Sequence, residues 1–188
     1  MLKISNISFS YDNKQIFKDF SLEVKDGERI CLFGESGCGK TTLLRLIANL
    51  EKPQKGEITN NKTISYCFQE NRLLPFKSVL ENITLYGADE NKAIEILTNL
   101  GLEDAENYNI SELSGGMERR VALARALAQD FDVLLLDEPF TGLDENNITV
   151  ASNVINKYLG NKTLILVTHS KDEAEKLGCK LVELNSFD

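Results

Sequence analysis

The chain has 188 residues, of which 42% are hydrophobic and 27% charged, and its formal net charge at pH 7 is −8. This composition indicates a single globular domain with a substantial core, and the sequence has neither an apolar run of membrane-spanning length nor an N-terminal secretion signal. The acidic charge disfavours non-specific nucleic-acid binding, because a phosphate backbone attracts basic surfaces.

The first 33 residues are expected to form an antiparallel β region. Hydrophobic and polar residues alternate over residues 7–11 and 20–24, as is typical of strands buried on one face. The apolar run Arg29–Phe33 is short enough to be a buried strand. A strand at this position would lead directly into a glycine-rich segment.

That segment, Gly34–Thr42, fits the phosphate-loop pattern G-x-x-x-x-G-K-[ST]. Its glycines allow backbone N–H groups to turn toward phosphate oxygens, and an apolar helix is expected to follow and to direct its N-terminus at them. Lys40 supplies a charge for the β- and γ-phosphates, and the Thr41 hydroxyl is a ligand for Mg²⁺. The sequence therefore predicts a nucleoside-triphosphate site. Its loop residues are Gly34, Glu35, Ser36, Gly37, Cys38, Gly39, Lys40, Thr41 and Thr42.

The four cysteines have no disulfide-like or zinc-like spacing. Cys31 and Cys67 lie in apolar runs and are expected in the core. Cys38 lies in the phosphate loop, where N–H groups and Lys40 would stabilise a thiolate, so redox sensitivity that ATP suppresses is one hypothesis. The alternative is a small residue with no redox role.

Strands and helices alternate along the rest of the chain, which favours a parallel α/β sheet with an antiparallel sheet on one side and a helical insert. The insert is expected from Leu73 to about Gln129. Within it, Asp89 should cap a helix over Ala93–Leu100 whose buried stripe includes Ile94, and Ser114 should cap a longer helix. The other expected elements are a helix ending near Leu50, strands at Glu57–Thr59, Thr63–Phe68, Val133–Leu136, Leu164–Val167 and Lys180–Leu184, and helices at Glu145–Leu159 and near Asp172–Leu177.

Two carboxylates, Asp137 and Glu138, follow the apolar run Val133–Leu136. A parallel strand delivers the residues at its C-terminal end to the ligand-binding edge of an α/β sheet. Asp137 is therefore expected to hold the water shell of Mg²⁺. Glu138, whose side chain points the other way, is expected to orient or deprotonate the attacking water.

The segment Leu113–Met117, Leu-Ser-Gly-Gly-Met, precedes a helical run. Ser114 and two glycines at a helix start make a second anion site, suited to a phosphate held by another subunit. The segment resembles the signature motif of the ATP-binding-cassette (ABC) ATPases, with Met117 where the family usually has Gln. The resemblance implies a head-to-tail dimer, a homodimer or a pair with another ATPase, in which Ser114 and Gly116 contact the nucleotide of the opposite subunit.

Further positions resemble family motifs in the family's order. Tyr11 is similar to the aromatic residue that stacks on adenine, and Gln69 to the glutamine that links Mg²⁺ and the attacking water to the helical part. Thr141–Asp144 resembles the dimer-contact loop, and His169 the histidine that senses the γ-phosphate. The resemblance thus implies catalytic roles for Lys40, Gln69, Glu138 and His169, metal-binding roles for Thr41, Gln69 and Asp137, and ATP and Mg²⁺ as cofactors.

The fold that the resemblance implies is the P-loop NTPase fold of ABC ATPases, with a RecA-like parallel-sheet core, an antiparallel β subdomain and a helical subdomain. A single domain is expected over residues 1–188. In it, 1–70 and 130–188 form the β subdomain and the nucleotide-binding core, and 71–129 form the helical subdomain. No additional regulatory segment is expected after the last strand.

Residues 68–83 are similar to the corresponding region of importer ATPases of the nitrate, sulfonate and taurine group, where this surface helps to form a groove for a permease helix. The alternative is that its apolar residues only pack the helical part. The resemblance implies a subunit of an importer for a small anionic or organic solute, cytoplasmic and peripheral on the inner face of the membrane. Its partners would be an integral-membrane permease and a solute-binding protein, without nucleic acid. The alternatives are a soluble ABC ATPase of DNA repair or ribosomes and a slowly hydrolysing regulatory module.

Overall fold

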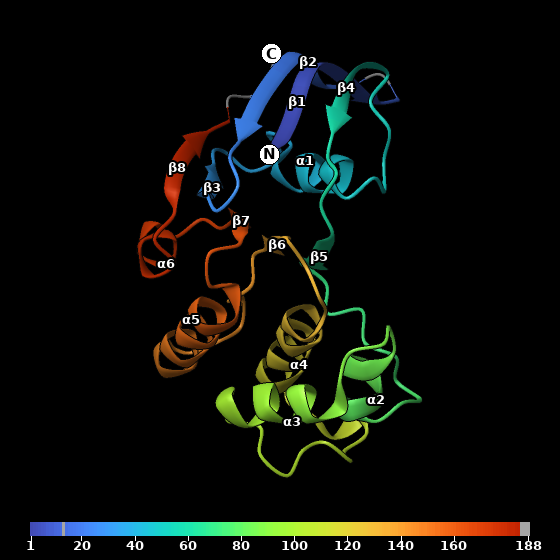
Figure 1. The fold of residues 1–188 in the computed structure, drawn as a ribbon, viewed down its shortest axis with the longest axis vertical. Helices are drawn as coiled ribbons and strands as arrows, with labels where there is room; N and C mark the ends of the chain where they lie inside the picture. Colours follow the sequence, from blue (N-terminus) through green and yellow to red (C-terminus); the bar gives the residue numbers. More distant parts are fainter. Residues whose placement is uncertain (13, 185–188) are drawn as a thin grey trace.

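The structure is a computed structural model that describes residues 1–12 and 14–184, and within this part of the chain the strands form two sheets (Figure 1). An antiparallel sheet of three strands has the order β2-β1-β4, and a parallel sheet of five strands has the order β5-β6-β7-β3-β8. The strands are β1 (Leu2–Tyr11), β2 (Lys14–Val24), β3 (Arg29–Phe33), β4 (Lys55–Thr59), β5 (Ile64–Cys67), β6 (Val133–Asp137), β7 (Thr163–Val167) and β8 (Lys180–Glu183).

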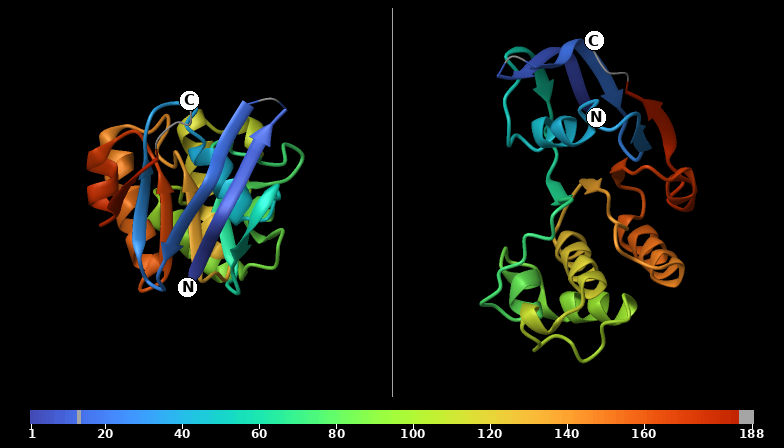
Figure 2. Two further views of the ribbon diagram at one scale, coloured as in Figure 1. Left: turned by 90° about the horizontal axis from the view of Figure 1, so that it is seen from above. Right: turned by 180° about the vertical axis from the view of Figure 1, so that it is seen from behind.

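The helices are distributed over both faces of the parallel sheet. They are α1 (Lys40–Ile47), α2 (Val79–Thr84), α3 (Glu90–Asn99), the 3₁₀ turn η1 (Ile110–Glu112), α4 (Gly115–Ala128), α5 (Glu145–Leu159) and α6 (Lys171–Lys176). In Figure 1 the antiparallel sheet lies at one end of the molecule with α1 beside it, and α2, α3 and α4 lie at the other end. The parallel strands lie between these ends, as the rear view in Figure 2 also shows.

The central parallel strands are buried on both faces, because helices or the second sheet cover each side. Every residue of β6 and β7 is buried. Alternate side chains of β6 enter different cores: Val133 and Leu135 join the core that contains α1 and the antiparallel sheet, whereas Leu134 and Leu136 join the core of α2 to α6. The period of two along an extended chain thus divides one continuous apolar run between two hydrophobic cores.

The cap residues that the sequence predicted are present. The Asp89 side chain accepts a hydrogen bond from the backbone N–H of Lys92 at the start of α3, and the Ser114 hydroxyl accepts one from Met117 at the start of α4. Each bond satisfies one of the backbone donors that a helix start leaves without a partner. Cys31 and Cys67 lie in the core as expected.

Two details of the sequence interpretation are wrong. The run Arg29–Phe33 does not belong to an antiparallel region: as β3 it pairs in parallel with β7 and β8. In α3, Ile94 is 38% exposed, and Ala93, Ile96 and Leu97 are the helix residues that reach the core.

Among the described residues, no helix has the length and apolar character needed to cross a membrane.

Candidate nucleotide-binding and catalytic site

The phosphate loop connects β3 to α1, at the edge where the parallel strands end. Gly39 precedes α1 with φ of 101°, in the left-handed region that favours glycine. A Cβ at Gly39 would lie 2.5 Å from Ile16 and 2.9 Å from Phe17 of the antiparallel sheet. Both the backbone conformation and the close packing of β2 against the loop therefore require glycine here.

Lys40 opens α1 and is almost fully buried, at 7% exposure. Its Nζ donates to the carbonyl oxygens of Gly34 and Glu35, at 2.8 Å each, and lies 3.9 Å from the Cys38 sulfur. The loop thus folds around the ammonium group and fixes its position. Cys38 itself is only 4% exposed, which restricts the access that its oxidation would require.

A cavity of about 260 Å³ lies between this loop and the ends of β5, β6 and β7. Most of the residues to which the sequence assigned phosphate, metal or catalytic roles meet there, although they are far apart in the sequence. The lining residues are Ser36, Gly37, Gly39, Lys40, Thr41, Thr42, Gln69, Asp137, Glu138, Val167 and His169.

Asp137 ends β6 and is 1% exposed. The Thr41 hydroxyl donates to its Oδ1 at 3.2 Å, and the Tyr66 hydroxyl donates to its Oδ2 at the same distance. Burial raises the pKa of Asp137 above its usual range, and these two hydrogen bonds oppose that change. Both oxygens of the carboxylate are therefore held in defined directions.

Glu138 lies at the first position after β6 and has φ of +49°, which is unusual for a residue with a side chain. Such a conformation costs about 1–3 kcal/mol and persists only where surrounding contacts impose it. Its backbone N–H donates to the Val167 carbonyl at 2.9 Å, and Oε1 lies 3.2 Å from Nε2 of His169 without an aligned hydrogen bond. Burial raises the pKa of Glu138, and the neighbouring His169 opposes the shift.

The donor set fits a hard divalent cation. Thr41 and Asp137 present a hydroxyl and a carboxylate oxygen to one another, and the amide of Gln69 lines the same cavity. Mg²⁺ is usually bound by one or two carboxylates together with phosphate oxygens and water, so this site does not need a cluster of acidic residues. The residues present are therefore compatible with Mg²⁺.

Arg119 was not singled out from the sequence, yet it connects three parts of the site. It lies in the first half of α4, is 2% exposed, and has no carboxylate partner within the described ranges. Its guanidinium donates instead to the carbonyl oxygens of Phe68, Gln69, Asp137, Glu138 and Pro139 and to the side chain of Asn71, at 2.6–3.3 Å. A buried charge is tolerated here because oxygen dipoles surround it.

Six of the predicted nucleotide contacts do not line this cavity in the described part of the chain: the loop residues Gly34, Glu35 and Cys38, and the more distant Tyr11, Ser114 and Gly116. Tyr11 is 41% exposed at the end of β1, where its hydroxyl donates to Glu51 at 3.4 Å. Ser114 and Gly116 lie at the exposed start of α4, and a Cβ at Gly116 would lie 3.5 Å from the carbonyl of Gly142. The signature segment thus adjoins the loop Thr141–Asp144.

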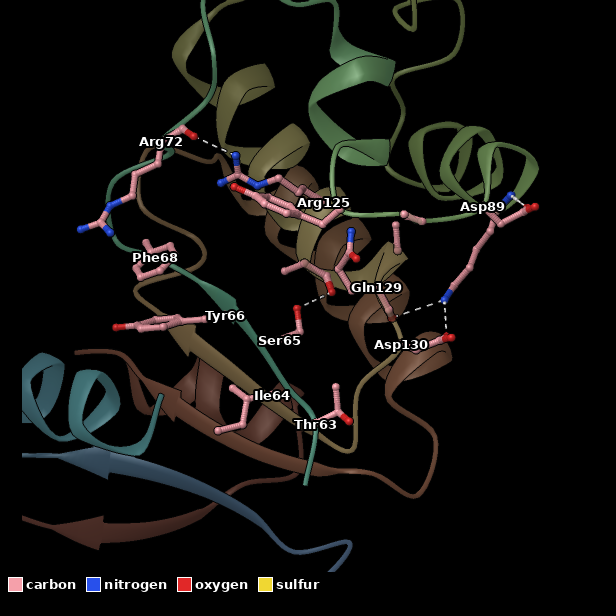
Figure 3. A pocket seen from close by; sticks show the side chains of 16 residues that line it. Thr63, Ile64, Ser65, Tyr66, Phe68, Arg72, Asp89, Arg125, Gln129 and Asp130 are labelled. Atoms are coloured by element: carbon pink, nitrogen blue, oxygen red, sulfur yellow. Dashed lines mark hydrogen bonds and ion pairs between the residues drawn. The ribbon is translucent and has the colours of Figure 1, made fainter. Parts of the chain in front are cut away.

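A larger cavity of about 840 Å³, referred to below as the groove, lies between β5 and the helices α3 and α4 (Figure 3). Aromatic and charged side chains dominate its walls. Tyr66 and Phe68 stack with ring centroids 4.0 Å apart, and the Arg125 guanidinium donates to the Arg72 carbonyl at 2.8 Å. Of the segment 68–83 that the sequence indicated, Phe68 and Arg72 line the groove, whereas Phe76 is 77% exposed outside it.

A phosphate loop between a central parallel strand and a helix, facing carboxylates at the end of a neighbouring strand, defines a phosphate-loop NTPase. Comparison with known proteins narrows this class. Residues 17–141 match the family described as ABC transporter. The aliphatic sulfonates import ATP-binding protein SsuB of Zymomonas mobilis is 39% identical, covering 97% of this chain and 81% of that protein. The taurine import ATP-binding protein TauB of Roseobacter denitrificans is also 39% identical, covering 96% and 76%.

A solved structure agrees with these relatives. The ATP-binding cassette MJ0796, a dimer in a post-hydrolysis state bound to ADP and Pi, superimposes with a TM-score of 0.88 and 29% identity, covering 98% of this chain and 94% of that one. The chain belongs to the ABC transporter family, and it is an ATP-binding ATPase. The resemblance that the motifs indicated is confirmed.

Proposed function

We propose that this protein is the ATP-hydrolysing subunit of an importer for a small anionic or organic solute. The observation that carries the proposal is the cavity in which the phosphate loop, Gln69, Asp137, Glu138 and His169 meet. The names of SsuB and TauB, which describe import proteins, support import and do not favour a role in DNA repair or on ribosomes.

The cavity supports a division of roles. Gly34–Thr42 binds the phosphates, and Lys40, fixed by two carbonyl oxygens, supplies positive charge to them. Glu138 holds the attacking water and accepts its proton, for which a carboxylate of raised pKa is suited. His169, adjacent to Glu138, contacts the γ-phosphate.

Mg²⁺ is the expected metal, with Thr41 and Gln69 as ligands and Asp137 behind them. When bound, the ion neutralises the charge that develops on the transferred phosphate. The hydroxyl, amide and carboxylate oxygens of the cavity are the donors that this ion prefers.

The site is completed by a second subunit. Ser114 and Gly116, at the start of α4, do not line the nucleotide cavity of their own chain, so a facing copy or a paired ATPase could use this helix start. The dimeric state of the MJ0796 cassette supports this arrangement. In the proposed dimer of this protein, Tyr11 would stack on adenine from the exposed end of β1.

The groove is the proposed contact surface for a helix of the permease. Its volume of about 840 Å³ and the exposed side chains of Tyr86 and Arg72 that line it suit an amphipathic partner helix. A permease contact would hold this subunit on the cytoplasmic face of the membrane, next to a solute-binding protein on the other side. Residues 71–129 form the helical subdomain in this proposal, and 1–70 and 130–188 the rest.

The test is co-purification from gently solubilised membranes of the source cell, with tagged wild type, Tyr86→Ala and Tyr108→Ala. Tyr86 lines the groove and is 72% exposed, whereas Tyr108 is a 45% exposed tyrosine outside it. We expect a polytopic permease, identified by mass spectrometry, with wild type and Tyr108→Ala and a severalfold loss with Tyr86→Ala. Recovery of ribosomal or DNA-repair proteins in place of a permease would contradict the proposal.

A further inference from the structure

A third, smaller cavity links the groove to the nucleotide cavity. It has a volume of about 90 Å³. Tyr66, Phe68 and Arg72 line both this cavity and the groove, and Thr41 and Asp137 line both this cavity and the nucleotide cavity. The small cavity therefore shares lining residues with both sites, and Gln69 of the predicted glutamine motif also lines it together with the nucleotide cavity.

The contacts through this layer are continuous. At the groove, the Arg72 guanidinium lies 4.1 Å from the ring centroid of Phe68, and this ring stacks on Tyr66 with an interplanar angle of 28° (Figure 3). The Tyr66 hydroxyl then donates to Oδ2 of Asp137 at 3.2 Å, opposite the Thr41 hydroxyl on Oδ1. The stack of the Arg72 guanidinium, the Phe68 ring and the Tyr66 ring is thus connected by a hydrogen bond to one oxygen of the Asp137 carboxylate.

The direction of this hydrogen bond is fixed. The Tyr66 hydroxyl is the donor to Oδ2 of Asp137, because an ionised carboxylate can only accept hydrogen bonds. A displacement of the Phe68 ring would weaken its stacking on Tyr66 unless the Tyr66 ring moved with it, because close-packed side chains have few voids to move into.

We propose that Tyr66 is a positioning residue that orients the Asp137 carboxylate and transmits displacements of the groove wall to it. This inference rests on the proposed function, since it takes the groove as the permease contact and Asp137 as the residue behind Mg²⁺. Seating of a partner helix against Phe68 and Arg72 would in this way alter the metal side of the nucleotide cavity directly, without a rearrangement of the sheet.

Tyr66→Phe tests the hydroxyl alone, because the ring and its stacking partner remain. The matched control is Tyr158→Phe, which removes a hydroxyl that contacts Glu95 and Asn99 on α3, outside the nucleotide cavity. The measurement is the affinity for a fluorescent ATP analogue in EDTA and over a range of Mg²⁺ concentrations. This binding readout does not depend on turnover.

For Tyr66→Phe we expect unchanged affinity in EDTA and a gain in affinity with Mg²⁺ that is about three- to tenfold smaller than in wild type, the net value of one ordinary hydrogen bond. Tyr158→Phe should behave as wild type. An identical Mg²⁺ dependence in wild type and Tyr66→Phe would overturn the role of Tyr66.

A double-mutant cycle tests transmission from the groove. Phe68→Leu removes the ring on which Tyr66 stacks and should weaken the Mg²⁺ dependence in the wild-type background but add nothing in the Tyr66→Phe background. An equal effect in both backgrounds would mean that Phe68 acts through the adjacent Gln69, and would overturn the transmission.

Asp137→Asn separates this inference from the proposed function. If Asp137→Asn loses the Mg²⁺ dependence while Tyr66→Phe keeps it, the positioning role is wrong and the metal assignment stands. If Asp137→Asn keeps the full Mg²⁺ dependence, the metal assignment fails, and the role of Tyr66 fails with it.

Discussion

The nucleotide cavity and the groove differ in how their walls are built. The nucleotide cavity is about 260 Å³ and is bounded by a glycine loop and strand ends whose polar groups already bind one another, such as Lys40 with the loop carbonyls. The groove is about 840 Å³, and exposed aromatic and arginine side chains such as Tyr86 and Arg72 form its rim. The walls of the nucleotide cavity suit a small molecule of fixed shape, whereas the groove is our proposed surface for a protein segment.

This difference predicts that substitutions in the two regions affect separate properties. Residues of the nucleotide cavity should control binding and turnover, and those of the groove wall should affect stability or partner binding. Arg119 donates to the carbonyl oxygens of Phe68 in the groove wall and of Asp137 in the nucleotide cavity. Tyr66 lines the groove and donates to Asp137. Substitution of either residue should therefore affect the properties of both regions. The predictions below run from the largest expected effect to the smallest.

Glu138→Gln should bind ATP but reduce the steady-state ATPase rate by about 10²–10³, the usual cost of losing one preorganised catalytic group. The amide cannot accept the proton of the attacking water, so ATP-bound dimer should accumulate, which light scattering after gel filtration would detect. Glu103→Gln, at an exposed position, is the control. Full turnover by Glu138→Gln would contradict the assignment of the base.

Arg119→Gln should lower the free energy of unfolding by about 3 kcal/mol, because several buried carbonyl oxygens lose their donor. Urea denaturation measures this change. Arg120→Gln, one residue further along α4 and half-buried, removes bonds to the carbonyl oxygens of Leu100, Gly101 and Gly116 and should cost clearly less. Because Arg119 also holds the strained Glu138 backbone, the folded variant should lose kcat while its KM for ATP changes little.

Lys40→Ala should weaken ATP binding by about 10- to 100-fold, since a charge-assisted contact to phosphate is lost. Equilibrium titration with a fluorescent nucleotide measures this loss. Lys171→Ala, on α6, serves as a control of equal charge change outside the cavity. Undiminished binding by Lys40→Ala would show that the loop does not bind the phosphates in the expected way.

Ser65→Ala should lower the free energy of unfolding by about 1 kcal/mol and leave nucleotide affinity unchanged. Ser65 lies in the groove wall, 6% exposed, and its hydroxyl donates to the Ala126 carbonyl at 2.7 Å. Exposed Ser111→Ala is the control. A change in ATP affinity with Ser65→Ala would mean that the groove wall and the nucleotide cavity are not separable even away from Tyr66.

The parts of the site that the sequence predicted are those that depend on spacing along the chain. Lys40 and Thr41 follow a strand at fixed positions, and Asp137 and Glu138 end another, so the common edge of a parallel sheet brings them together. Cap residues such as Asp89 were predictable for the same reason, because their contacts are local.

The remaining features depend on contacts between distant segments. A charged residue in a helix normally faces solvent, and nothing in the sequence around Arg119 reveals the carbonyl oxygens that surround it. The sequence pattern of Arg29–Phe33 is compatible with a parallel or an antiparallel sheet. Its pairing partners lie more than a hundred residues away, so the surrounding sequence does not show which of the two it joins. Burial of Ile96 in place of Ile94 reflects which face of α3 meets α4, which periodicity alone does not decide.

The position of β3 between β7 and β8 has a consequence for synthesis of the protein on the ribosome. β3 comprises residues 29–33, but its two neighbours in the sheet comprise residues 163–167 and 180–183. The ribosome therefore synthesises the phosphate loop more than a hundred residues before β7, the first strand with which β3 can pair. Contacts of such long sequence separation form late and slowly. A nascent chain that ends before β7 lacks both parallel neighbours of β3, and we expect it to bind nucleotide more weakly than the folded protein.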